Sequence, residues 1–102
     1  MTAPTYATAR AACVARYGPP RCDGLIHGVA IAEWPLAPGF SVDEVGGIVL
    51  QDDGDEVWLS AEVPGGPPME LWTLAGALPS ATLPDALDAA EAFLRTTATK
   101  GP

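Results

Sequence analysis

Residues 45–63 have the sequence VGGIVLQDDGDEVWLSAEV, in which two apolar segments flank an aspartate-rich centre. The centre, residues 52–55, is typical of a tight turn, because glycine and aspartate tolerate the backbone angles that turns require. After the turn, the side chains alternate between an apolar face of Val57, Leu59, Ala61 and Val63 and a second face of Glu56, Trp58, Ser60 and Glu62. Such alternation predicts a strand with one face buried and one in solvent. The segment therefore predicts an antiparallel pair of strands over residues 45–51 and 56–63.

Two more strands are expected, one before and one after this pair. Residues 24–34 are mostly apolar on both faces, which favours a central strand, and Gly28 within them indicates a bulge or a close approach of another backbone. Residues 69–76 follow a Pro-Gly-Gly-Pro-Pro turn and form the fourth expected strand. Because short turns join the last three strands, we expect a mostly antiparallel meander.

Helices are expected near both ends of the chain. Residues 4–17 are rich in alanine, with Pro4 in the first turn and Gly-Pro-Pro at 18–20 as a stop. Residues 83–96 carry apolar side chains at helical spacing on one face and mostly acidic side chains on the other. We expect residues 97–102 to form a frayed tail.

These elements predict an α+β fold with a single domain over residues 1–102, in the order α-β-β-β-β-α. Ser41 and Glu44 match a capping box, which adds one short helical turn between the first two strands. Since a sheet must bury an apolar face, we expect both long helices to pack on one face of a four-stranded sheet. The opposite face is then left open around Trp58.

The chain is strongly acidic: its 102 residues include 13 Asp and Glu against 5 Lys and Arg, a formal net charge of −8. This charge repels the phosphates of nucleic acids and anionic membrane surfaces, so we expect direct binding to neither. Arg10, Arg16 and Arg21 lie within the first 22 residues, which contain no acidic residue. Either the first helix docks on its own acidic sheet, or the molecule has a dipolar surface that steers a basic partner.

The sequence contains no apolar run of membrane-spanning length and no hydrophobic stretch of the signal-peptide type at its start. Its two cysteines, Cys13 and Cys22, are too few for a disulfide framework. We therefore expect a cytoplasmic protein in which both cysteines are thiols.

Few residues suggest catalysis or metal binding. The chain has one histidine, so an imidazole-dependent enzyme or ligand-binding domain would have to use His27, with Cys22 as its partner. The spacing of Cys13, Cys22 and His27 matches no zinc motif, and residues 52–56 depart from the calcium-binding EF-hand pattern. We expect no enzymatic activity, no metal and no cofactor, and keep the His27 and Cys22 site as an alternative.

Trp58 says more about function than His27 or Cys22, because this large apolar side chain is expected on the solvent face of its strand. Tryptophan is enriched at the centres of protein interfaces, and acidic neighbours would complement a basic partner. On the next strand, Trp72 shares a row with Glu70, and we expect this row to adjoin Trp58. The predicted partner-binding residues are Trp58, Glu56, Glu62, Trp72 and Glu70. The alternative is structural: Trp34 or Trp72 caps one end of the core and Trp58 shields an edge.

We therefore expect a small protein–protein interaction module, such as an accessory protein, a regulator or an inhibitor of the immunity-protein kind, that binds a basic partner protein. The alternative is a subunit of a larger, phage-like assembly formed by self-association. Arg10 falls on the same helix face as Tyr6 and Tyr17, where it stacks on their rings, pairs with an acid of the sheet or anchors a partner. We favour the intramolecular pair.

Overall fold

The computed structural model describes residues 4–64 and 69–99. In chain order the elements are α1 (Tyr6–Tyr17), β1 (Asp23–Ile26), β2 (Val29–Pro35), α2 (Val42–Val45), β3 (Gly47–Asp52), β4 (Val57–Glu62), β5 (Met69–Ala75) and α3 (Leu83–Thr99). The strands form one sheet in the order β1-β2-β3-β4-β5, and every neighbouring pair is antiparallel. The α+β prediction is confirmed, but the described part of the chain has five strands, not four.

The additional strand arises because residues 24–34 form a hairpin, where we predicted one strand. The chain reverses at His27 and Gly28, whose φ angles are 52° and 80°. Two successive residues with positive φ are typical of the tight two-residue turn that matches the twist of a hairpin. Gly28 therefore belongs to a turn, and the expected bulge or close approach is wrong.

The long helices follow the sequence prediction closely. α1 begins after Thr5, whose hydroxyl oxygen accepts a hydrogen bond of 3.2 Å from the N–H of Thr8. It ends at Gly18, whose N–H donates to the carbonyl of Val14. α3 continues to Thr99, so residues 97–99 are helical rather than a frayed tail, and residues 100–102 lie outside the described part. Neither helix, nor any other in the described residues, combines the length and apolar character needed to cross a bilayer.

One face of the sheet packs against α1 and α3, as predicted. Leu50, Leu59 and Leu74 from the sheet and Cys13 from α1 are its largest fully buried side chains. Both helices present alanines to this core: Ala9 on α1, and Ala86 and Ala90 on α3. These small side chains let the helix backbones approach the sheet closely, which larger residues would prevent.

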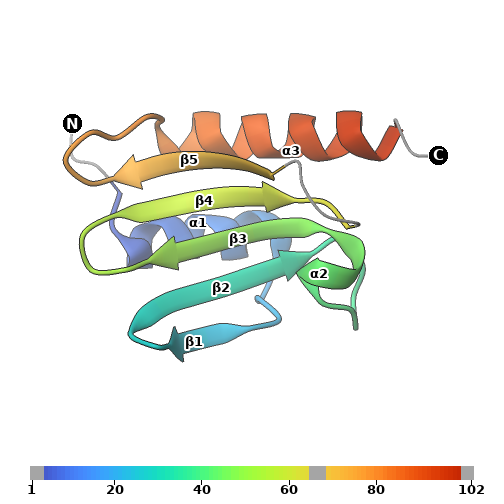
Figure 1. Cartoon of the computed structure of the whole chain (residues 1–102), viewed down its shortest axis with the longest axis horizontal. Helices are drawn as coiled ribbons and strands as arrows, with labels where there is room; N and C mark the ends of the chain where they lie inside the picture. Colours follow the sequence, from blue (N-terminus) through green and yellow to red (C-terminus); the bar gives the residue numbers. More distant parts are fainter. Residues whose placement is uncertain (1–3, 65–68, 100–102) are drawn as a thin grey trace.

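The other face of the sheet, here called the open face, is turned toward the viewer in Figure 1, with α1 passing behind the strands. Its side chains follow from the strand register: Ile31, Gln51, Trp58 and Thr73 form one cross-strand row, and Glu33, Val49, Ser60 and Leu71 form the next. The short helix α2 contacts β2 and β3 at one end of this face. The prediction that the long helices leave this face open around Trp58 is confirmed.

Candidate functional site

Trp58 lies near the middle of the open face, on β4. Its indole N–H donates a 2.7 Å hydrogen bond to Oε1 of Gln51, its cross-strand neighbour on β3. This bond satisfies the only donor of the indole and fixes the ring next to β3. The side chain remains half-buried, so part of the ring is available for contact.

Apolar side chains extend the exposed surface on both sides of Trp58. Leu71 on β5 is 52% exposed, and Ile26 at the end of β1 is 47% exposed. Val49 and Ser60 lie deeper on the same face and are almost completely buried. The open face is therefore partly apolar, with a packed centre and large side chains projecting around it.

One end of the open face carries three carboxyl groups, Glu33, Asp43 and Glu62, here called the carboxylate cluster. The capping box at the start of α2, in which the Ser41 N–H donates to Oε1 of Glu44 over 2.9 Å, holds Asp43 near the two strands. Burial and the negative charge of Asp43 raise the pKa of Glu33, although Arg21 opposes the shift. Burial, Asp43 and Glu33 likewise raise the pKa of Glu62. The three carboxylates repel one another, and two of them, Glu33 and Glu62, are partly desolvated, whereas Asp43 is exposed.

The predicted contribution of β5 to this face is wrong. Leu59 pairs with Trp72 and Ala61 with Glu70, so both residues point to the helix side, where Trp72 packs against the core. A strand presents alternate residues to one face, and this register buries Leu74 and partly buries Trp72. Burying that pair removes more apolar surface from water than burying Leu71 and Thr73 would, and these two occupy the open face instead.

Glu56, also predicted here, lies in the turn before β4. Its N–H donates to Oδ1 of Asp53 over 2.9 Å, and its side chain is exposed beside Gly76. Of the five predicted residues, the structure therefore brings Trp58 and Glu62 together on the open face. Glu33 and Asp43 were missed, because one lies in an apolar segment and the other in a short helix. A signal for Glu33 was its position as an acidic residue within a strand.

Arg10 makes the intramolecular pair that we favoured. Its guanidinium forms an ion pair with Asp23 of β1, with 3.0 Å between Nε and Oδ1 and a second contact from Nη2 to Oδ2. The hydrogen bond from Arg10 holds the pKa of Asp23 below its usual value. This pair neutralises the carboxylate of Asp23.

The residues considered for catalysis or metal binding are not brought together. Cys22 precedes β1 and His27 follows it, so the strand separates them, and His27 is exposed in the hairpin turn. Cys13 is buried in the core, and burial raises its pKa to about 11, which keeps it a thiol at neutral pH. Asp52 and Asp53 accept hydrogen bonds from backbone N–H groups of their own turn. Among the described residues, no group of three or more His, Cys, Asp or Glu could hold a metal.

A groove of about 790 Å³ opens at the other side of the sheet, between the end of α1, the last turns of α3 and the segment after β2. It is lined by Tyr17, Pro19, Arg21, Trp34, Pro35, Leu36, Pro38, Gly39, Ile48, Glu91, Leu94 and Arg95. The sequence does not predict this groove, because its pattern gives Tyr17 and Trp34 as packing residues. The cluster of prolines around two aromatic residues was the available signal.

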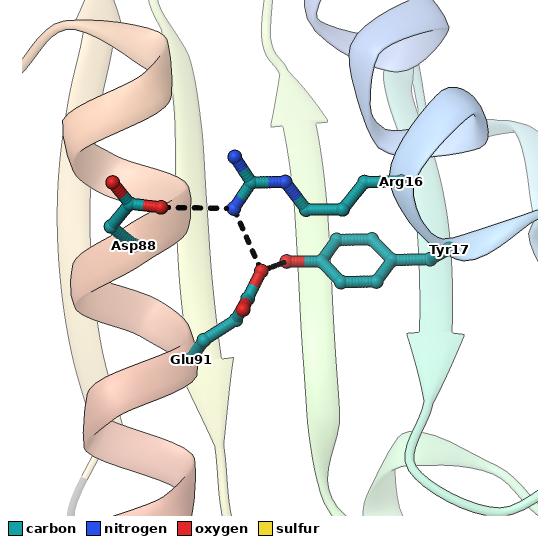
Figure 2. Close-up of polar contacts among 4 residues, drawn as sticks. All are labelled: Arg16, Tyr17, Asp88 and Glu91. Carbon is teal, nitrogen blue, oxygen red and sulfur yellow. Dashed lines mark hydrogen bonds and ion pairs between the residues drawn. The ribbon is translucent and has the colours of Figure 1, made fainter.

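Hydrogen bonds hold the aromatic walls of this groove. The indole N–H of Trp34 donates to the carbonyl of Gly18 over 2.8 Å. Figure 2 shows that the Tyr17 hydroxyl donates to Oε2 of Glu91, at 2.5 Å, and that Arg16 bridges Glu91 and Asp88, at 2.7 and 3.2 Å. Hydrogen bonds from Tyr17 and Arg16 lower the pKa of Glu91, and burial followed by the bond to Glu91 raises the pKa of Tyr17.

Comparisons with known proteins add no assignment to these two surfaces. The chain matched no protein-family model, no curated protein and no solved structure.

Proposed function

We propose that the protein is a non-enzymatic protein–protein interaction module that binds a basic segment of a partner protein through the open face. An accessory protein, a regulator or an inhibitor would act in this way. The carboxylate cluster, on the same face of the sheet as Trp58, is the observation that carries the proposal. Three neighbouring negative charges, two of them partly desolvated, favour any arrangement that brings a cation among them.

A lysine or arginine of the partner would supply that cation. Its positive charge would attract Glu33, Asp43 and Glu62 and so offset their mutual repulsion. Arginine in particular could hydrogen-bond to two carboxylates at once. Trp58 and the exposed Leu71 would contact an apolar residue next to it. The expected motif in the partner is therefore a basic residue close to an aromatic or aliphatic one.

The proposal places the module in the cytoplasm. Both cysteines are free thiols, with Cys13 buried and Cys22 half-buried, and this supports a reducing compartment.

Selection from a displayed library of random peptides tests the proposal without a known partner. We expect the wild-type protein to enrich peptides in which arginine or lysine neighbours an apolar residue. Affinity should fall about tenfold in Glu62→Gln and in Trp58→Ala, and it should fall with added salt. Glu70→Gln is the matched control, because it removes an acid from the helix side of the neighbouring strand. Equal affinities of Glu62→Gln and Glu70→Gln would contradict the proposal.

A second candidate, a subunit of a self-associating assembly, is favoured by the difference between the two edges of the sheet. At the β5 edge, the N–H groups of Ser80 and Ala81 donate to the carbonyl of Thr73, at 2.9 and 3.2 Å. At the β1 edge, Leu25 is 76% exposed. An apolar edge strand is a template for pairing with another chain. If assembly is the function, light scattering should detect oligomers that Leu25→Lys dissolves; a monomer at all concentrations would reject this candidate.

A further inference from the structure

The groove between α1, α3 and the segment after β2 is built to keep its shape. Tyr17 and Trp34 are held by their hydrogen bonds to Glu91 and Gly18. Pro19 and Pro35 fix the backbone at two further points of the wall. A rigid pocket loses little conformational entropy when a ligand binds. The volume of about 790 Å³ is within the usual range for a small-molecule site.

The charge of the groove is opposite to that of the molecule. Of the four basic residues within residues 4–64 and 69–99, Arg21 and Arg95 line the groove, and Arg16 braces its wall through Glu91. Glu91, the one acidic residue in the lining, already accepts hydrogen bonds from Arg16 and Tyr17. Arg21 and Arg95 against Glu91 give the lining a net positive charge in a chain with a formal net charge of −8, which complements a negative group.

We infer that the groove is a binding site for a small amphipathic anion, namely a flat apolar body with a carboxylate at one end. The body would lie between the Tyr17 ring and the side chains of Leu36 and Leu94, above Trp34 at the floor. The carboxylate would face Arg21, whose planar guanidinium presents parallel N–H donors to two carboxylate oxygens. This site adjoins the carboxylate cluster through Arg21, whose charge also acts on Glu33 and Glu44. It does not depend on the function proposed for the open face.

Two matched probes test the inference: naphthylacetate and its neutral amide, naphthylacetamide. By calorimetry we expect naphthylacetate to bind at a single site with a dissociation constant below about 1 mM. The amide should bind about tenfold more weakly, because it lacks the charge that the arginines complement. In the NMR spectrum of isotope-labelled protein, the Trp34 indole N–H signal should shift and the Trp58 indole N–H signal should not.

Variants at two arginines locate the carboxylate. Arg21→Gln should weaken naphthylacetate about five- to tenfold and leave the amide unchanged. Arg10→Gln, which removes an arginine paired with Asp23 outside the groove lining, should change neither. The inference is overturned if naphthylacetate fails to bind, if the amide binds equally well, if Arg21→Gln and Arg10→Gln behave alike, or if Trp58 shifts instead of Trp34.

Discussion

Glu62 and Glu91 respond to their surroundings in opposite directions. The pKa of Glu62 is raised by burial and by the neighbouring carboxylates, so folding disfavours its charged form. The pKa of Glu91 is lowered by hydrogen bonds from Tyr17 and Arg16, so folding favours its charged form. A shifted pKa is a contribution to stability, and these two contributions have opposite signs and opposite pH dependence.

The charge of Glu62 destabilises the fold at neutral pH. We expect Glu62→Gln to raise the free energy of unfolding at pH 7 by a few tenths to about 1 kcal/mol, since the side chain is only half-buried. Because the folded pKa lies above the ordinary value of 4.5, the advantage should shrink as the pH falls through the folded pKa toward that value. Urea denaturation at neutral and acidic pH measures both. A variant less stable than wild type at pH 7 would contradict the assignment.

The same variant separates stability from binding. If Glu62 is retained for a partner, Glu62→Gln should gain stability and lose affinity for the basic peptide at once. Such a trade-off is common where a functional site holds groups in an unfavourable arrangement.

Glu91 is expected to behave in the reverse manner. Glu91→Gln should lower the free energy of unfolding at pH 7 by about 1 kcal/mol, because it weakens the bonds to Arg16 and Tyr17. The loss should disappear on acidification, as wild-type Glu91 itself becomes protonated below its depressed pKa. Asp88→Asn is the control: its contact with Arg16 is longer, at 3.2 Å, and its side chain is 72% exposed, so the effect should be near zero. Equal losses in both variants would refute this account of the cluster.

Among the elements, the start of β3, where Gly47 pairs with Pro35 at the end of β2, has no room for a side chain. Gly47 has a φ angle of 153°, and a Cβ atom there would lie 2.3 Å from the carbonyl oxygen of Trp34. That contact is with backbone, which cannot move without breaking the pairing of the two strands. Gly47→Ala should therefore cost at least about 3 kcal/mol or prevent folding. Gly24→Ala on β1, where a Cβ would meet nothing within 4 Å, should be close to neutral in the same denaturation experiment; similar midpoints for both variants would disprove this packing.

The turn of the β1–β2 hairpin contains a residue whose replacement should stabilise the protein. His27 has a φ angle of 52°, a left-handed conformation that asparagine adopts at lower cost. His27→Asn should therefore stabilise the protein by a few tenths to about 1 kcal/mol, observed as a higher melting temperature. A loss of stability would mean that the imidazole has a role beyond the turn.

The sequence predicted those elements in which one periodicity dominated. Residues 56–63 alternate clearly, and β4 lies where the alternation indicated. Residues 24–34 are apolar on both faces and lack an Asn-Gly or Asp-Gly turn, so the reversal at His27 had no strong local signal. On β5, Trp72 and Leu71 both suit a core, and only the pairing with β4 decides which is buried.

The same reason limited prediction of the candidate sites. Trp58 and Glu62 are neighbours in the alternating pattern of one strand, and the structure places them together on the open face. Glu33, Asp43 and the groove residues come from segments far apart in the chain, so their proximity depends on the tertiary fold. For Arg10, the uneven charge along the chain predicted an ion pair within the molecule. It did not identify Asp23 as the partner, because that also depends on the tertiary fold.

Over the whole molecule, the two candidate surfaces differ in local charge. Glu33, Asp43 and Glu62 lie together at one end of the open face, whereas the groove lining has Arg21 and Arg95 against Glu91. Arg21 lies where the two surfaces meet, since its charge also acts on Glu33. Such a distribution would steer a basic partner to the open face and a small anion to the groove. Added salt should weaken both interactions, since it screens both fields.

The most direct test of the proposed function is the affinity of the selected basic peptide for Glu62→Gln relative to Glu70→Gln, measured by calorimetry at low salt. Both variants remove one acidic charge, from adjacent strands but from opposite faces of the sheet. If the open face binds the partner, Glu62→Gln should bind about tenfold more weakly than wild type, while Glu70→Gln binds nearly as well as wild type. Equal affinities of the two variants would show that net charge, and not the open face, holds the peptide.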